Sequence, residues 1–277
     1  MRKTALEQKG LFFWVLLVIV LVLVLLPLYW IFVTAMKSPV ENISRTPIFV
    51  PHELYLQNFV KVIQGGFFGN LFNTVFVAFF STLFSLALSF LAGYALSRHR
   101  FPFRFNTVFL VWVLAVKILP PVVLAIPLYT LFASAHLLNN LPGLVLVYQV
   151  YTLPYCIWML FGFFKALPVE YEQAARIDGA SDLGILAYIV FPLMRSGVIA
   201  TSIFSIIMAW DEFLFALLFL RNPHLETLPL LIVNFITEYE TLWGNLMAIG
   251  LLATLPLLLF SGYVYRRMTT GFTMSLK

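Results

Sequence analysis

The chain has 277 residues, of which 62% are hydrophobic and only 10% are charged, and its formal net charge is +5. This composition excludes a soluble globular domain and is typical of an integral membrane protein. The positive charge forms no clustered basic face, so it does not indicate nucleic-acid binding. The single cysteine, Cys156, excludes an intrachain disulfide.

Six apolar stretches are long enough to cross the hydrocarbon layer of roughly 30 Å, which takes about 20 helical residues. They cover residues 11–33, 71–97, 105–131, 137–164, 196–220 and 241–265. These runs are too long and too uniformly apolar for the strands of a closed barrel. We therefore predict an all-α polytopic membrane protein, a single transmembrane domain over residues 1–277 with six transmembrane helices.

Lysine and arginine are unevenly distributed between the loops on the two sides of the predicted bundle. Of the 17 such residues, twelve fall on one side, four fall on the other, and Lys117 lies inside a span. Loops rich in Lys and Arg remain in the cytoplasm. Both termini and the loop 165–195 are therefore predicted to be cytoplasmic, and the segment 34–70 is predicted to lie outside.

The loop 168–192 is a polar island between uncharged runs, reading P-V-E-Y-E-Q-A-A-R-I-D-G-A-S-D-L-G-I-L-A-Y-I-V-F-P. Its first proline can start a helix, and Glu170 and Glu172 then fall in the first turn, where carboxylates favour the helix dipole. Gly179 is a stop signal, and Ser181 can cap a second short helix that ends at the last proline. The pattern predicts a helix–turn–helix hairpin that docks a soluble partner, although a merely structural amphipathic hairpin would have a similar sequence.

This loop resembles the EAA loop of ABC importer permeases, whose motif is E-A-A, three residues, G, nine residues, I, any residue, L-P. The matching residues, at the family's spacing, are Ala174, Ala175, Gly179, Ile189 and Pro192. Two positions depart from the motif, since Gln173 stands where glutamate is usual and Phe191 where leucine is usual. The neighbouring Glu172 is an open candidate for the role of the missing glutamate.

The resemblance extends over nearly the whole chain, which is similar to the maltose-permease-like subunits of carbohydrate importers. The motifs that carry it are N-T-V-F-V-A (73–78), G-Y-A-L-S-R (93–98), L-P-P with I-P-L-Y (119–129), W-D-E-F (210–213) and T-L-P-L (227–230). It implies a permease in a bacterial or archaeal plasma membrane that forms half of a sugar translocation path. The implied partners are a second homologous permease, two ATP-binding subunits that hold ATP and Mg, and an extracytoplasmic solute-binding protein.

The resemblance also implies that the loop couples the permease to the ATPase. The residues expected to do so are Glu170, Glu172, Gln173, Ala174, Ala175, Arg176, Asp178 and Gly179. The chain itself contains no G-x-x-x-x-G-K-[ST] phosphate-binding loop. Its four histidines have no ligand spacing, and no nucleophile–base arrangement is apparent. We therefore expect no catalytic site, metal site or cofactor in this chain.

Three ionisable residues fall within predicted spans: Lys117, Asp211 and Glu212. Such residues usually face a bundle interior or a wet cavity. With Trp210, which suits the apolar faces of sugars, they are candidates for the translocation path. The alternative is an ion pair between spans, or an acid that reaches toward the outer surface.

Three other functions remain open at this stage. The chain fits an importer permease for glycerol phosphodiesters or other polyols, because related permeases share these motifs. It also fits an autonomous secondary transporter that carries a coupling-ion site at Lys117, Asp211 and Glu212. A non-transporting assembly subunit is the third reading.

Overall fold

The computed structural model describes residues 11–236 and 241–274, with side chains described for residues 12–236 and 241–262. Within these ranges the chain is helical, as predicted, and the β pairing is limited to an isolated antiparallel bridge between Ile236 and Thr241. The basic residues at the two ends on which the orientation prediction draws, among them Arg2 and Lys277, lie outside the described residues.

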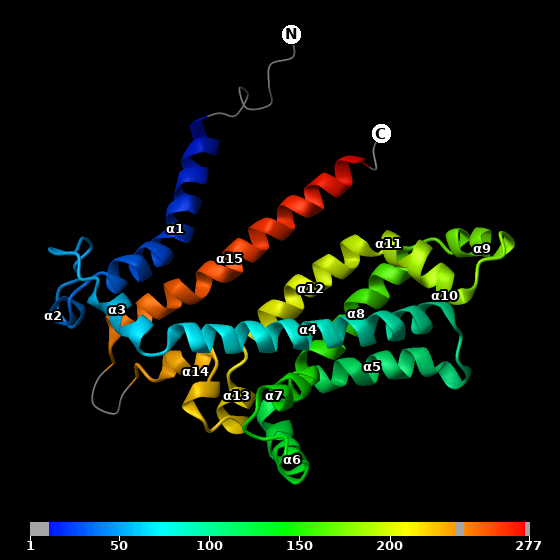
Figure 1. Cartoon of the computed structure of the whole chain (residues 1–277). Coiled ribbons are helices and arrows are strands. Elements are labelled where there is room, and N and C mark those ends of the chain that lie inside the picture. Colours follow the sequence, from blue (N-terminus) through cyan, green and yellow to red (C-terminus); the bar gives the residue numbers. More distant parts are fainter. Residues whose placement is uncertain (1–10, 237–240, 275–277) are drawn as a thin grey trace. The chain divides into compact units, whose positions relative to one another are not determined.

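The helices follow one another along the chain as labelled in Figure 1. The longer ones are α1 (Leu11–Ala35), α4 (Phe67–Arg98), α5 (Phe105–Ile118), α6 (Pro121–Ser134), α8 (Gln149–Ala166), α12 (Arg195–Trp210) and α15 (Trp243–Met274). The shorter ones are α2 (Pro39–Asn42), α3 (Gln57–Gln64), α7 (Leu141–Val147), α9 (Glu170–Ile177), α10 (Asp182–Gly184), α11 (Phe191–Leu193), α13 (Leu214–Phe219) and α14 (Leu228–Val233), with the single turns η1 (Pro102–Arg104), η2 (Ile185–Val190) and η3 (Pro223–Leu225).

Three of these helices, α1, α4 and α15, are long and apolar enough to cross a membrane by themselves. Three further pairs reach that length only as bent pairs: α5 with α6 at 98°, α7 with α8 at 44°, and the helix that ends in α11 with α12 at 72°. The described chain thus has three spanning helices, or up to six if each bent pair is one span.

Some of the six apolar windows predicted as spans contain a break in the helix. The window 105–131 is interrupted at Leu119 and Pro120, because a proline has no backbone N–H to continue the helix. The window 196–220 is interrupted after Trp210, where the non-helical residues 211–213 separate α12 from α13. Pro-rich apolar sequence therefore predicts the position of a span better than its continuity.

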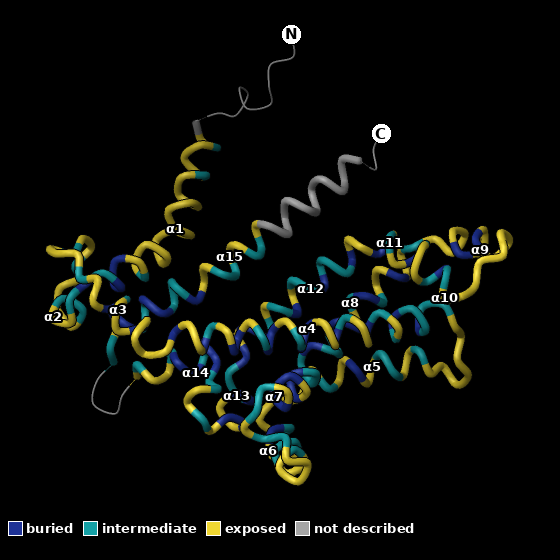
Figure 2. Tube along the Cα trace, in the orientation of Figure 1, coloured by how far each residue is buried: buried dark blue, intermediate teal, exposed yellow. Residues whose placement is uncertain are grey.

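The chain packs as two compact units. Unit 1 comprises Met1–Phe67 and Ile232–Leu255, and unit 2 comprises Phe68–Leu231 and Pro256–Lys277. Within unit 1, most of the α1 surface is exposed, as the long yellow stretch of Figure 2 shows. An apolar helix with this exposure is stable in lipid or against another apolar surface.

In unit 2, α8 packs against both α5 and α12. Small polar side chains join α4 to α8 and α12: Ser85 Oγ lies 2.5 Å from Thr152 Oγ1 and donates to Gln149 Oε1 at 2.6 Å, while Thr82 Oγ1 donates to Ser205 Oγ at 3.1 Å. Small residues let membrane helices approach closely, and their hydroxyls bond across the contact. This buried polar seam holds the helices that position the hairpin described next.

Candidate functional site: the α9–α10 hairpin

The polar island folds as a hairpin in unit 2, made of α9, a tight turn and a second helical segment. Gly179 closes α9 with φ +81°, a left-handed conformation that favours glycine, and the Ala180 N–H donates to the Ala175 carbonyl at 3.0 Å. The Ser181 hydroxyl accepts from the Gly184 N–H at 3.2 Å and caps α10. Both local predictions are therefore confirmed.

Two helix boundaries differ from the prediction. The first helix begins at Glu170, two residues after Pro168. The second continues from α10 through a π-helical turn (η2) and ends with α11 at Leu193, one residue beyond Pro192. The bend between α11 and α12 comes at Met194. The hairpin is consequently joined to the apolar helix α12 through this bend.

An ion pair fastens the hairpin to the end of α4. Arg98, the last residue of α4, donates from Nε to Glu172 Oε1 at 2.7 Å, and the Tyr94 hydroxyl donates to Glu172 Oε2 at 2.9 Å. The two charged side chains are only 11% and 4% exposed. The remaining guanidinium nitrogens donate to the carbonyls of Phe164 and Leu167, both at 3.0 Å.

This arrangement satisfies several groups at once. The carbonyls at the C-terminal end of a helix have no intrahelical partner, and α8 ends at this point. One arginine thus pairs with a carboxylate on α9 and satisfies two carbonyls at the end of α8. Charge-assisted hydrogen bonds of this kind are about twice as strong as neutral ones. The hairpin is therefore held at a defined position relative to α4 and α8.

Beneath the hairpin lies an apolar core. It consists of Leu160, Phe164, Ala175, Ile185, Val190 and Met194. Phe90 and Tyr94 of α4 pack edge-on against the ring of Phe164, with ring centroids 5.1 and 5.7 Å apart. The hairpin, α4 and α8 thus form one packed body, which can transmit displacement rather than absorb it.

The eight predicted coupling residues divide between the two faces of the hairpin. Glu172 and Ala175 are buried, at 3% and 8% exposure, and face the interior of unit 2. The other six are exposed: Glu170, Gln173, Ala174, Arg176, Asp178 and Gly179. Of the eight residues expected to couple to the ATPase, Glu172 and Ala175 are thus not on the exposed face, and Glu172 bonds to Arg98 instead.

Sequence reasoning missed the apolar residues on the same outer face. Ile177 is 86% exposed and Leu183 is 79% exposed, and Tyr171 and Tyr188 are exposed as well. Exposed large apolar side chains on an otherwise polar hairpin are typical of surfaces that contact another protein or a membrane. In the sequence, these residues are apolar positions that lie between the charged residues of the loop 168–192. Arg98 ends the motif G-Y-A-L-S-R (93–98), and nothing in that motif marks it as the partner of Glu172.

The candidate path residues are not brought together as an ion pair. Lys117 Nζ donates to the Tyr151 carbonyl at 3.2 Å and lies 5.6 Å from the ring centroid of Tyr155. No ion pair between Lys117 and Asp211 or Glu212 occurs in the described part of the chain. The alternative of an interspan pair is thereby corrected.

Glu212 caps a helix. Its carboxylate accepts from the backbone N–H groups of Phe215 at 2.9 Å and Ala216 at 3.2 Å, at the start of α13, and it is 7% exposed. Carboxylates are stabilised there by the free N–H groups and the helix dipole. Trp210 is also buried, whereas Asp211 is exposed at the break between α12 and α13.

Groups of histidine, cysteine and acidic residues that could hold a metal ion are absent among the described residues. The prediction of no metal or cofactor in this chain remains a prediction.

Comparison with known proteins identifies similar chains. Residues 85–272 match the model of the family described as binding-protein-dependent transport system inner membrane component. The sulfoquinovosyl glycerol transport system permease protein SmoH of Agrobacterium fabrum is 35% identical over 256 residues, covering 92% of this chain and 89% of the relative. The diacetylchitobiose uptake system permease protein DasC of Streptomyces coelicolor is 32% identical over 248 residues, covering 89% of each. The trehalose/maltose permease protein MalG of Thermococcus litoralis is 30% identical over 262 residues, covering 92% of this chain and 93% of the relative.

A solved structure shares the fold. The crystal structure of a bacterial ABC transporter involved in the import of the acidic polysaccharide alginate aligns with a TM-score of 0.76 at 21% identity, covering 96% of this chain and 98% of the other. The resemblance seen in the EAA-like loop is confirmed by the family match and by these relatives. The chain therefore belongs to the binding-protein-dependent transport system inner membrane component family, and it is a membrane-spanning permease subunit of an ABC importer.

Proposed function

We propose that this chain forms half of the translocation path of an ABC importer for a carbohydrate. The carbohydrate class is supported by the relatives, whose names specify sulfoquinovosyl glycerol, diacetylchitobiose and trehalose/maltose. In the proposal the partners are a second homologous permease, a pair of ATP-binding subunits that hold ATP and Mg, and an extracytoplasmic solute-binding protein. The chain itself binds no nucleotide and performs no catalysis.

The observation that carries the proposal is the outer face of the α9–α10 hairpin. It presents Ile177 and Leu183 among charged residues such as Arg176, on a body fixed by the Arg98–Glu172 ion pair. An exposed apolar centre with a polar rim is the composition of a protein interface. The hairpin lies in the cytoplasm in this proposal, where an ATPase is available to bind it.

The coupling follows from the rigidity of this connection. Closure of the ATPase pair displaces the hairpin, and the segment from α10 to α11 carries that displacement to the bend at Met194, where α12 follows. Bends between packed helices are places where rigid bodies rotate relative to one another. The permease would thereby alternate between inward-open and outward-open states.

For the path itself, the proposal keeps all four candidates but assigns them different roles. Asp211 and Lys117 are exposed and available to a hydroxylated substrate. Trp210 and Glu212 are buried, and in the proposal they hold the break between α12 and α13 in place behind Asp211.

The test uses the importer reconstituted in proteoliposomes with its partner permease, its ATPase and its binding protein. Ile177→Asp places a charge at the centre of the apolar face, where losses of 2 kcal/mol or more are typical of interface centres. We expect the ATPase activity stimulated by the loaded binding protein to fall at least tenfold, with weaker retention of the ATPase during purification. The matched control is Val40→Asp on α2, a residue that is 76% exposed outside the hairpin. Normal coupling in Ile177→Asp, or an equal loss in the control, would refute the assignment of the face.

A further inference from the structure

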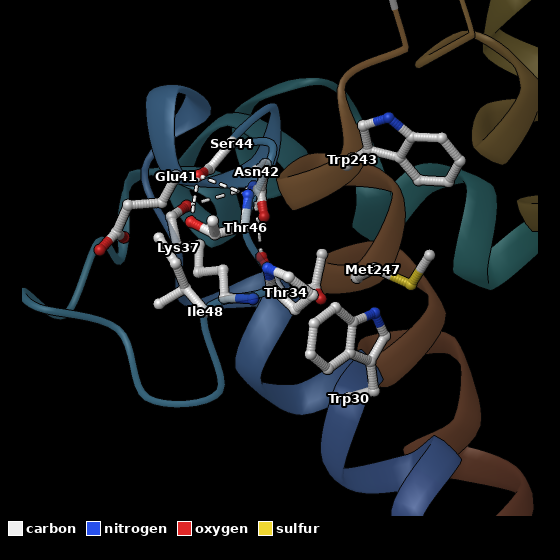
Figure 3. Close-up of a pocket in the computed structure, with 11 residues that line it drawn as sticks. Trp30, Thr34, Lys37, Glu41, Asn42, Ser44, Thr46, Ile48, Trp243 and Met247 are labelled. Atoms are coloured by element: carbon white, nitrogen blue, oxygen red, sulfur yellow. Dashed lines mark hydrogen bonds between the residues drawn. The ribbon is translucent and has the colours of Figure 1, made fainter.

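Unit 1 contains a cavity of about 270 Å³ that the transport mechanism does not use. It lies between the end of α1, the segment around α2 and the start of α15 (Figure 3). Among its lining residues are Trp30, Thr34, Lys37, Asn42, Trp243 and Met247. The volume lies below the roughly 300–1,000 Å³ of pockets for drug-sized ligands. The cavity is therefore suited to one small group and not to an oligosaccharide.

The central feature of this cavity is the ammonium group of Lys37. The residue is only 2% exposed, and its Nζ lies 4.1 Å from the ring centroid of Trp30. No hydrogen-bond acceptor or ion-pair partner of this ammonium occurs among the residues that the structure describes. Burial lowers the pKa of Lys37, and the carboxylate of Glu41 acts in the opposite direction. A buried cation is stable when an anion or several acceptors face it.

Glu41 lines the same cavity, but no ion pair between Glu41 and Lys37 occurs among the described residues. Its Oε1 accepts from the backbone N–H of His52 at 3.0 Å and lies 2.7 Å from Nδ1 of the His52 ring. Its Oε2 accepts from the Ser38 N–H at 3.2 Å. The carboxylate is thus engaged at the wall of the cavity, and the ammonium of Lys37 is left for another acceptor.

Two further buried polar atoms in this wall have no partner in the described chain: Thr34 Oγ1 and Asn42 Oδ1. Thr34 is 6% exposed. The Asn42 amide donates from Nδ2 to the carbonyls of Thr34 and Lys37, at 3.4 and 3.5 Å, which orients Oδ1 as a free acceptor. A buried polar group without a partner destabilises the folded chain. Residues that line the cavity therefore carry one buried cation and two buried polar atoms, a hydroxyl and an amide oxygen, that have no partner in the described chain.

The position of the cavity along α1 places it near lipid headgroups. This helix has 25 residues, which at 1.5 Å per residue is roughly 37 Å, more than the roughly 30 Å of hydrocarbon. Trp30 lies in the last two turns, at the level where tryptophans gather at a membrane interface. The residues that follow α1, including Lys37, thus lie at or beyond headgroup depth.

We propose that this cavity binds an anionic polyol, whose acidic group pairs with the Lys37 ammonium and whose hydroxyls bond to Thr34 and Asn42. The apolar edge of the polyol lies against the indole of Trp30. This chemistry occurs in the glycerol phosphate headgroup of phosphatidylglycerol and in soluble polyol phosphates or sugar acids. Occupancy does not depend on the ATPase face, so the proposal stands apart from the proposed transport function.

The experiment uses the full chain purified within its complex. In the lipid arm, nanodiscs of phosphatidylcholine with one-tenth phosphatidylglycerol are compared by native mass spectrometry for the lipid retained. In the soluble arm, thermal unfolding in phosphatidylcholine alone is followed with added glycerol 1-phosphate or glucuronate, since a ligand of the native state raises the unfolding temperature. The test variants are Lys37→Met, which keeps the stem of the side chain, and Thr34→Val, which keeps its shape. Lys61→Met on α3 removes an exposed cation as the matched control.

We expect one of the two arms to give a positive result for both the wild-type chain and Lys61→Met. In the lipid arm, that result is retention of phosphatidylglycerol at least tenfold over phosphatidylcholine. In the soluble arm, it is an unfolding temperature that the anionic polyol raises above that of the no-ligand reference. Lys37→Met should reduce that preference to within twofold, and Thr34→Val should weaken it severalfold. Selective retention in the lipid arm identifies the headgroup as the occupant, and stabilisation in the soluble arm identifies a soluble polyol. The proposal is overturned if neither arm shows a preference, if Lys37→Met retains it, or if Lys61→Met loses it equally.

Discussion

Replacing Glu172 by alanine should loosen α9 from the rest of unit 2. In the native chain its carboxylate is 4% exposed and accepts hydrogen bonds from Arg98 and the Tyr94 hydroxyl, at 2.7 and 2.9 Å. The Arg98 guanidinium is 11% exposed and has no other carboxylate among the described ion pairs. Glu172→Ala therefore leaves a buried charge with two carbonyl acceptors and no counter-charge.

The size of the effect follows from this burial. Removing one partner of a buried ion pair typically destabilises by about 3–5 kcal/mol, because the other charge stays behind uncompensated. At 1.4 kcal/mol per factor of ten, the equilibrium for local opening of α9 should rise by roughly two to three and a half orders of magnitude. Replacing both partners by apolar residues is often neutral, so Arg98→Met combined with Glu172→Ala should recover much of the loss.

The assay is hydrogen exchange of the α9 amides in the purified complex, read as a free energy of local opening. Gln173→Ala is the matched control, because it is exposed on the same helix and should change the opening energy by no more than about 0.5 kcal/mol. Coupling of ATPase to transport should fall together with α9 protection. A Glu172→Ala chain whose α9 amides remain as protected as those of the control would refute the reasoning.

Three further predictions concern a close packing contact, a turn and the titration of a carboxylate. A methyl group added at Gly197 would place Cβ 2.7 Å from the ring of the facing phenylalanine on α8, so Gly197→Ala should lower the free energy of unfolding by about 1–3 kcal/mol in thermal or denaturant unfolding. Gly162→Ala, which meets nothing within 4 Å, should not lower it, and equal effects would contradict the packing. Gly179 has φ +81°, a conformation that costs about 1–2 kcal/mol for other residues. Gly179→Ala should therefore speed hydrogen exchange in the hairpin roughly tenfold, and Gly179→Asn should speed it less. Unchanged exchange would argue against the turn. Hydrogen bonds from the His52 backbone and then its ring lower the pKa of Glu41 from 4.5 to about 2. The contribution of this carboxylate to stability is therefore present above pH 4.5 and lost as the pH falls toward 2. Hydrogen exchange around α2, corrected for intrinsic rates, should rise in that window, and Glu41→Gln should flatten the rise. An unaltered pH response in Glu41→Gln would exclude this cause.

The relation between sequence and structure differs between the apolar helices and their ends. The approximate positions of the spans can be predicted because hydropathy over about 20 residues is a local property, and the windows begin within a few residues of α1, α4 and α15. The breaks at Pro120 and after Trp210 could not be located with the same certainty. A proline in an apolar run can be accommodated as a kink or can end the helix, and packing decides which occurs.

The hairpin shows the same division at the level of single residues. Gly179 and Ser181 have the roles that local chemistry predicts, because a left-handed cap and a hydroxyl cap involve backbone groups only a few residues away. The role of Glu172 depends on Arg98, which lies 74 residues earlier in the chain, and no local pattern encodes that distance. From the sequence alone, an acidic residue in a polar segment is therefore predicted to lie on the surface. Only the tertiary structure shows that its partner lies beside it.

Lys37 and Glu212, two charged residues near the membrane, show the same difference between what sequence predicts and what tertiary structure decides. Sequence alone predicts that Lys37 lies just beyond a span and that Glu212 lies within one, because both follow from counting residues along apolar runs. The cap that Glu212 forms on α13 is local, but tertiary structure buries its carboxylate and closes the cavity around the ammonium of Lys37. Burial and pairing depend on which surfaces meet in three dimensions, and these two properties separate a charge that caps a helix from one that can bind a ligand.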